Sequence, residues 1–157
     1  MKVKKINKLD DDGSGTLNIQ HENILSPFVS KCVIFDLKCL IFGNKWWGIE
    51  KISYDDFKAL TSFGRLEKLD LGSTIVTSDN GEIIPYDSLL DHTPALRFLR
   101  LVYNPYQQLS QKFIEKICAS NLEYFKIFEL PKNFKGETFL AQIAKKKPNL
   151  QVYLSFK

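Results

Sequence analysis

The chain has 157 residues, of which 44% are hydrophobic and 25% are charged, a balance typical of one soluble globular domain with a real core. The formal charge of +4 is small and spread along the chain, so it does not by itself indicate nucleic acid. No stretch approaches the roughly 20 apolar residues of a membrane helix, and the first residues lack the apolar run of a secretory signal. Three cysteines in no metal-ligand spacing indicate reduced thiols. We therefore expect an intracellular protein, cytoplasmic or nuclear, with no membrane span and no cofactor.

Residues 1–31 are the least regular part of the sequence. Lysines alternate loosely with hydrophobic residues over the first nine positions, which is typical of an exposed strand. The polar run DDDGSG follows at residues 10–15, and Asp-Gly and Ser-Gly pairs mark tight turns. We expect residues 1–31 to be an irregular or strand–turn segment that caps a second region, residues 32–157.

The run from Asp10 to Gly15 has a second interpretation, as a calcium-binding loop. Asp10, Asp12 and Ser14 would supply oxygen atoms at positions 1, 3 and 5 of an EF-hand, and Gly15 would stand at position 6, where that loop turns. However, His21 occupies position 12, where the loop requires a bidentate carboxylate, and a neutral imidazole is a poor ligand for a hard cation. We favour the turn and expect no metal, with the calcium loop as the alternative.

A repeated L-x-x-L-x-L pattern organises the rest of the chain, and it is the strand signature of a leucine-rich repeat. The first leucines of the successive copies are Leu37, Leu66, Leu96, Leu122 and Leu150. They are separated by steps of 29, 30, 26 and 28 residues. A single match to this pattern is weak evidence, but several matches at a nearly regular spacing indicate a repeat architecture.

Helix signals lie between the successive strand patterns. Ser53 is placed to cap a first helix, and Gly64 to end it. Pro85 opens a second helix, Ser110 caps a third and Gly136 begins a fourth. The first helix should bury three apolar residues: Phe57, Leu60 and Phe63.

Each period therefore consists of a strand, a turn, a helix and a connection that leads back to the next strand. This order predicts an α/β fold of the leucine-rich repeat solenoid type, with short parallel strands on one face and helices on the other. From Leu150 onward the apolar residues alternate strictly, which puts Tyr153 where a core leucine is expected. We expect a terminal strand with a shifted register, because end repeats are commonly atypical.

Four segments carry a family resemblance: residues 52–61 (ISYDDFKALT), 64–69 (GRLEKL), 81–85 (GEIIP) and 125–134 (FKIFELPKNF). They resemble the leucine-rich C-terminal regions of nematode F-box proteins, over about residues 35–157. In that family an F-box docks to a ubiquitin-ligase scaffold, and the repeat region is thought to recruit substrates. Residues 1–31 lack the apolar helical pattern of an F-box. The resemblance implies a protein-binding module that recruits substrates for an F-box-type ubiquitin ligase.

We expect no enzyme. The two histidines, His21 and His92, are isolated in the sequence, and no nucleophile elbow or phosphate-binding glycine loop is present. His92 falls at a predicted helix end, where we expect it to cap carbonyl groups or to interact with the helix dipole.

The residues between the leucines should point to the open side of the sheet, because side chains alternate along a strand. We predict a partner-binding surface there, formed by Lys68, Asp70, Phe98, Arg100, Tyr124, Lys126 and Phe128, with Gly72 and Val102 completing three rows. Aromatic residues and arginine dominate the energetics of protein interfaces.

A nucleic-acid-binding solenoid is the alternative, because basic and aromatic residues interleave on this surface. Acidic residues among them, Glu67, Asp70 and Glu123, favour a protein partner. The lysine run at residues 145–147 lies at a predicted helix end, where the helix dipole accounts for it.

Overall fold

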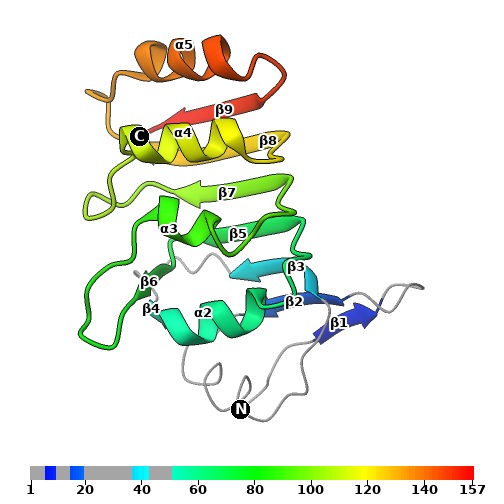
Figure 1. The fold of residues 1–157 in the computed structure, drawn as a ribbon. Helices are drawn as coiled ribbons and strands as arrows, with labels where there is room; N and C mark the ends of the chain where they lie inside the picture. Colours follow the sequence, from blue (N-terminus) through cyan, green and yellow to red (C-terminus); the bar gives the residue numbers. More distant parts are fainter. Residues whose placement is uncertain (1–5, 10–14, 20–36, 43–50) are drawn as a thin grey trace.

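The structure is a computed structural model that describes residues 6–9, 15–19, 37–42 and 51–157. The described residues form an α/β fold in which helices lie over one face of a mostly parallel sheet (Figure 1). Among them, no helix is long and apolar enough to cross a membrane.

The main sheet has seven strands in the described part of the chain. In spatial order they are β1 (Ile6–Leu9), β2 (Gly15–Ile19), β3 (Leu37–Phe42), β5 (Lys68–Gly72), β7 (Phe98–Val102), β8 (Tyr124–Leu130) and β9 (Gln151–Phe156). β1 pairs antiparallel with β2, and every other neighbouring pair is parallel. The predicted parallel strands are therefore confirmed.

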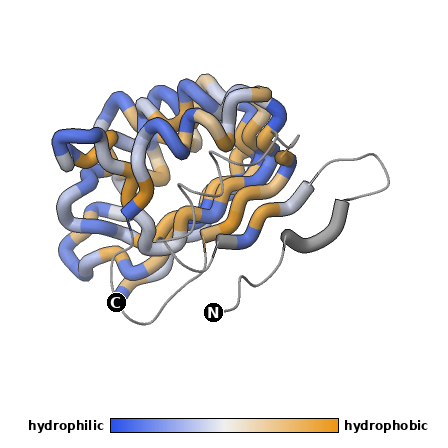
Figure 2. Tube along the Cα trace, turned by 90° about the horizontal axis from the view of Figure 1, so that it is seen from below, coloured by the Kyte–Doolittle hydropathy of each residue, from blue (hydrophilic) through white to orange (hydrophobic). Residues whose placement is uncertain are grey.

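Helices connect the strands that follow one another in the sheet. They are α2 (Tyr54–Thr61), α3 (Tyr86–Leu90), α4 (Gln111–Ala119) and α5 (Gly136–Lys146). Within the described residues, one helix lies in the chain between each successive pair from β3 to β9, as parallel pairing requires a crossover connection. Figure 2, which views the fold from below, shows the helices in one layer and the sheet in the other.

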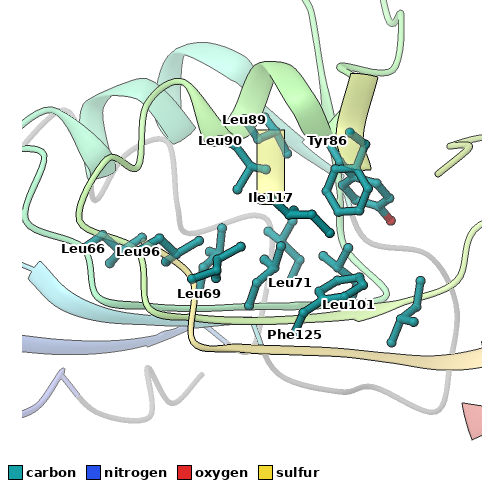
Figure 3. Packing of buried hydrophobic residues seen from close by; sticks show 14 of the residues in the cluster. Leu66, Leu69, Leu71, Tyr86, Leu89, Leu90, Leu96, Leu101, Ile117 and Phe125 are labelled. Atoms are coloured by element: carbon teal, nitrogen blue, oxygen red, sulfur yellow. The ribbon is translucent and has the colours of Figure 1, made fainter. Parts of the chain in front are cut away.

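The leucine pattern forms the sheet side of the core. Leu66, Leu69 and Leu71 are each 1% exposed. The corresponding residues of β7 and β8 are also buried: Leu96, Leu99, Leu101, Leu122, Phe125 and Ile127. Figure 3 shows sheet residues such as Leu69, Leu101 and Phe125 facing Leu89, Leu90 and Ile117 from the helices. The repeat spacing thus predicted the buried face of the sheet correctly.

Aromatic rings link neighbouring units inside this core. The Phe113 ring of α4 lies 5.7 Å from Tyr86 of α3 and 5.7 Å from Phe125 of β8, measured between ring centroids. Phe125 continues to Phe139 of α5 at 6.3 Å. This series of rings connects three helices to one strand, so removing a central ring should affect several elements at once.

The predicted helix caps are present. The Ser53 hydroxyl oxygen accepts a hydrogen bond from the Asp56 amide at 3.1 Å, and the Ser110 hydroxyl oxygen accepts one from the Phe113 amide at 3.1 Å. Gly64 follows α2 with a φ of 65°, a left-handed conformation that favours glycine. Phe63 was predicted on the inner face, but it lies beyond the end of α2 and is 52% exposed.

The terminal register shift is confirmed. Phe125 of β8 lies opposite Val152 of β9, and Ile127 lies opposite Leu154. Tyr153 consequently faces the other way, opposite Lys126, and is 53% exposed.

The strand expected within the first nine residues is present as β1, and β2 joins it to β3 at the edge of the main sheet. A second, two-stranded parallel sheet was not predicted. It joins β4 (Lys51–Ser53) to β6 (Ile75–Thr77), before α2 and after β5 respectively. Most of the proposed calcium loop, including Asp10, Asp12, Ser14 and His21, lies outside the described residues.

Candidate partner-binding surface

The sheet face opposite the helices carries two rows of side chains in register. We call it the open face. The first row runs Lys68, Phe98, Tyr124 and Gln151 across β5, β7, β8 and β9, and the second runs Asp70, Arg100, Lys126 and Tyr153. Six of the seven predicted site residues lie in these rows, and the seventh, Phe128, pairs with Val102 in a shorter third row. Gly72 does not join that row, because a register shift after Asp70 places it opposite Leu101.

Phe98 stands at the centre of a cluster of cations and rings. The Lys68 ammonium nitrogen lies 5.1 Å from the centroid of the Phe98 ring, and the Lys126 ammonium nitrogen lies 5.5 Å from it. The Tyr124 ring is 6.4 Å away on the neighbouring strand. Two cations therefore approach one aromatic ring within the range of a cation–π interaction.

Arg100 and Asp70 form an ion pair in the second row. Arg100 Nη1 donates to both carboxylate oxygens of Asp70, at 3.0 and 2.8 Å, and the side chains are 23% and 12% exposed. Asp70 also accepts a hydrogen bond from the Gly72 amide at 3.0 Å. The carboxylate that sequence reasoning counted as part of a mixed-charge surface is thus neutralised within the sheet.

A second aromatic contact lies toward β9. The Arg100 guanidinium carbon is 4.8 Å from the centroid of the Phe128 ring, and the Phe128 and Tyr153 rings are 5.5 Å apart. Tyr153 was not among the predicted site residues. The signal was available, because the shifted register of the last strand turns this residue to the same side as Lys126.

The acidic residues Glu67 and Glu123 lie at the edge of the open face, just before their strands begin. Backbone hydrogen bonds continue the sheet there, from the Arg97 amide to the Glu67 carbonyl at 2.8 Å and from the Glu123 amide to the Arg97 carbonyl at 2.8 Å. The Arg97 side chain donates to Glu123 at 2.6 Å, and this hydrogen bond raises the pKa of Arg97.

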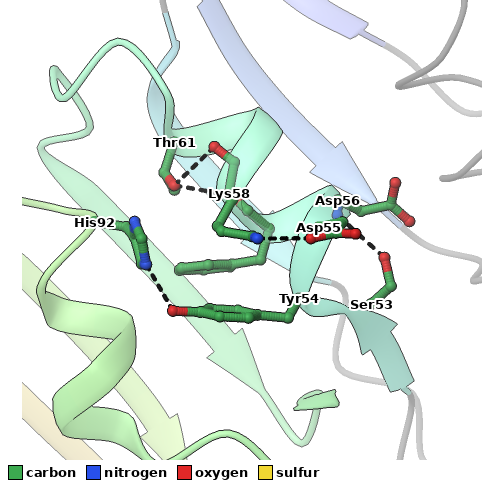
Figure 4. A network of polar contacts seen from close by, with 8 residues as sticks. Ser53, Tyr54, Asp55, Asp56, Lys58, Thr61 and His92 are labelled. Atoms are coloured by element: carbon green, nitrogen blue, oxygen red, sulfur yellow. Dashed lines mark hydrogen bonds and ion pairs between the residues drawn. The ribbon is translucent and has the colours of Figure 1, made fainter. Parts of the chain in front are cut away.

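A separate polar network surrounds α2 (Figure 4). Tyr54 Oη and His92 Nε2 are 2.7 Å apart, so the His92 ring bonds a side chain of α2, a contact that was not predicted. Lys58 forms an ion pair with Asp55 at 2.6 Å, which raises the pKa of Lys58, and its nitrogen lies 4.9 Å from the centroid of the Tyr54 ring. The bond between Tyr54 and His92 joins α2 to the turn after α3.

No cluster of three histidine, cysteine or acidic residues in the described part of the chain is arranged to hold a metal ion. Comparison with known proteins finds no family model, no curated protein and no solved structure that matches the chain.

Proposed function

We propose that this chain is a leucine-rich repeat solenoid that acts as a non-catalytic protein-interaction module, with the open face as its binding surface. The stacking of parallel strands at a period of 26 to 30 residues supports the solenoid. In such an arrangement equivalent strand positions form continuous rows across units, which suits an extended partner.

One observation carries the binding proposal: the open face exposes aromatic side chains in register. Tyr124 is 39% exposed and Tyr153 is 53% exposed, and Phe98 and Phe128 lie half-buried beside them. A row of aromatic rings next to arginine is the composition of an interface hot spot. Folding alone gains little from placing large rings in water.

The resemblance of residues 52–61, 64–69, 81–85 and 125–134 to nematode F-box proteins extends this proposal. The chain would recruit substrate proteins for an F-box-type ubiquitin ligase, with the ligase scaffold as a further partner. The extension rests on the resemblance, and the open face supplies a surface for the substrate.

Affinity purification followed by mass spectrometry tests the proposal, with the Phe98→Ala/Tyr124→Ala double variant as the matched bait. We expect proteins that bind the wild-type chain and are lost with the variant, and recovery of ubiquitin-ligase components would support the F-box extension. Partners retained equally by both baits would contradict the assignment of the open face. A pure RNA signal would favour the nucleic-acid alternative.

A further inference from the structure

We infer that the open face receives an acidic segment of its protein partner, with a partner carboxylate bound between Lys68 and Lys126. This inference rests on the proposed function and adds the chemistry of the ligand. It follows from how the charges of the open face are distributed.

Lys68 and Lys126 are cations without a counter-ion among the described residues. Neither forms an ion pair there, although both lie beside the Phe98 ring, at 5.1 and 5.5 Å. An ammonium group carries three hydrogen-bond donors, and a contact with a ring face leaves donors available. Two ammonium groups held near one ring therefore form a local positive site.

The nearby carboxylate does not neutralise this site. Asp70 accepts two hydrogen bonds from Arg100 and one from the Gly72 amide. Arg100 and Asp70 cancel each other as a pair, so the described open face keeps the net positive charge of the two lysines. An anionic side chain of a partner would restore the balance.

The surroundings favour a peptide over a nucleic acid. Other charges at the two ends of β8 are already paired, Glu123 with Arg97 at 2.6 Å and Glu129 with Lys157 at 3.1 Å. A nucleic-acid strand carries a phosphate at every nucleotide and is bound along an extended basic groove. The open face instead offers one short positive site between aromatic rings. An acidic side chain would fit the short positive site, and apolar side chains next to it would fit the aromatic rings.

Selection of random phage-displayed peptides on the wild-type protein tests the inference. We expect the selected peptides to be enriched in Asp or Glu next to aromatic or aliphatic residues. Binding of the corresponding synthetic peptides should weaken roughly two- to fivefold with Lys68→Ala or Lys126→Ala, the range of an exposed ion pair. The charge reversal Lys68→Glu/Lys126→Glu should weaken binding more, by about tenfold or more, because it replaces attraction with like-charge repulsion.

Two variants serve as controls. Lys132→Glu/Lys145→Glu changes the net charge equally at exposed lysines outside the open face and should leave peptide binding unchanged. Lys68→Gln/Lys126→Gln removes the charges without reversing them, and it should weaken binding while the circular dichroism spectrum stays that of the wild type. It keeps the test valid if the reversal variant fails to fold.

The outcomes separate the inference from the proposed function. Peptides that depend on Phe98 and Tyr124 but lack acidic residues and tolerate both lysine variants would overturn the acidic partner and leave the binding surface intact. Peptides insensitive to Phe98→Ala/Tyr124→Ala would overturn both. Tighter, lysine-dependent binding of oligo(dT) than of any acidic peptide would replace the acidic segment with nucleic acid.

Discussion

The two faces of the sheet are built from alternate residues of the same strands, yet they differ in composition. On the helix side, β7 and β8 present leucine, phenylalanine and isoleucine, all 2% exposed or less. On the open side, the same two strands present Phe98, Arg100, Tyr124, Lys126 and Phe128, which lie half-buried or exposed. Neighbouring residues thus occupy very different environments.

This difference shows at which strand positions folding requires apolar side chains and at which positions it does not. The helix side must be apolar on each of these strands, because the helices cover it. The open side has no such requirement in the described part of the chain, so its aromatic rings and cations need another reason. We assign that reason to binding.

The largest expected effect comes from Phe125→Ala compared with Tyr124→Ala, its neighbour on β8. Phe125 is fully buried between Phe113 and Phe139. Its truncation should lower the free energy of unfolding by about 3–5 kcal/mol. Tyr124→Ala should cost less than about 1.5 kcal/mol, the contribution of an aromatic pair. Urea denaturation measures the free energy of unfolding of both variants. Equal losses of stability would contradict the proposed difference between the two faces.

The ion pairs of the open face offer a sharper comparison, between Arg100→Ala and Arg97→Ala. Arg100→Ala leaves the mostly buried Asp70 without its cation and should cost about 1–3 kcal/mol. Arg97→Ala removes an exposed pair with Glu123 that solvent screens, so it should cost less than Arg100→Ala. Denaturation curves of the two variants check the order, and a larger loss for Arg97→Ala would contradict it.

A smaller effect is expected at Lys147, which follows α5 and bonds to the end of α4. Its ammonium nitrogen donates to the carbonyl oxygens of Ser120 and Ile117 at the end of α4, at 2.5 and 3.4 Å. Lys147→Met should cost about 1 kcal/mol in thermal unfolding. Lys145→Met, at an exposed position in the last turn of α5, is the control and should change stability by less.

The smallest effect concerns the Cys118 thiol on α4. Burial raises its pKa, and the positive charges of Lys146 and Lys147 oppose this in part. A raised pKa leaves less thiolate at a given pH, so alkylation of Cys118 should follow a pH profile displaced upward from that of the unfolded chain. Iodoacetamide labelling read out by peptide mass spectrometry checks this, and a downward displacement would contradict the burial.

Local patterns in the sequence predicted much of the fold. The spacing of Leu66, Leu69 and Leu71 defined the buried face, and Ser53 and Ser110 marked helix starts, because these signals act over a few residues. Strands as short as β4 and β6, with three residues each, carry no readable period. Their pairing depends on contacts between segments that are distant in the sequence.

The candidate site was predictable in position but not in its contacts. Alternation along β5, β7 and β8 placed its residues on one face. The sequence did not show which charges neutralise each other, because this depends on the register between strands. Asp70 and Arg100, for example, are 30 residues apart. The bond between Tyr54 and His92 spans 38 residues and had no local signal.

The central claim is that the aromatic rings of the open face serve binding and not folding. Denaturation of Phe98→Ala/Tyr124→Ala, measured beside the single variant Phe125→Ala, tests it most directly. We predict that the double variant loses less stability than Phe125→Ala, although it lacks two rings instead of one. A loss of about 3–5 kcal/mol for each ring would show that both belong to a core and would contradict the account.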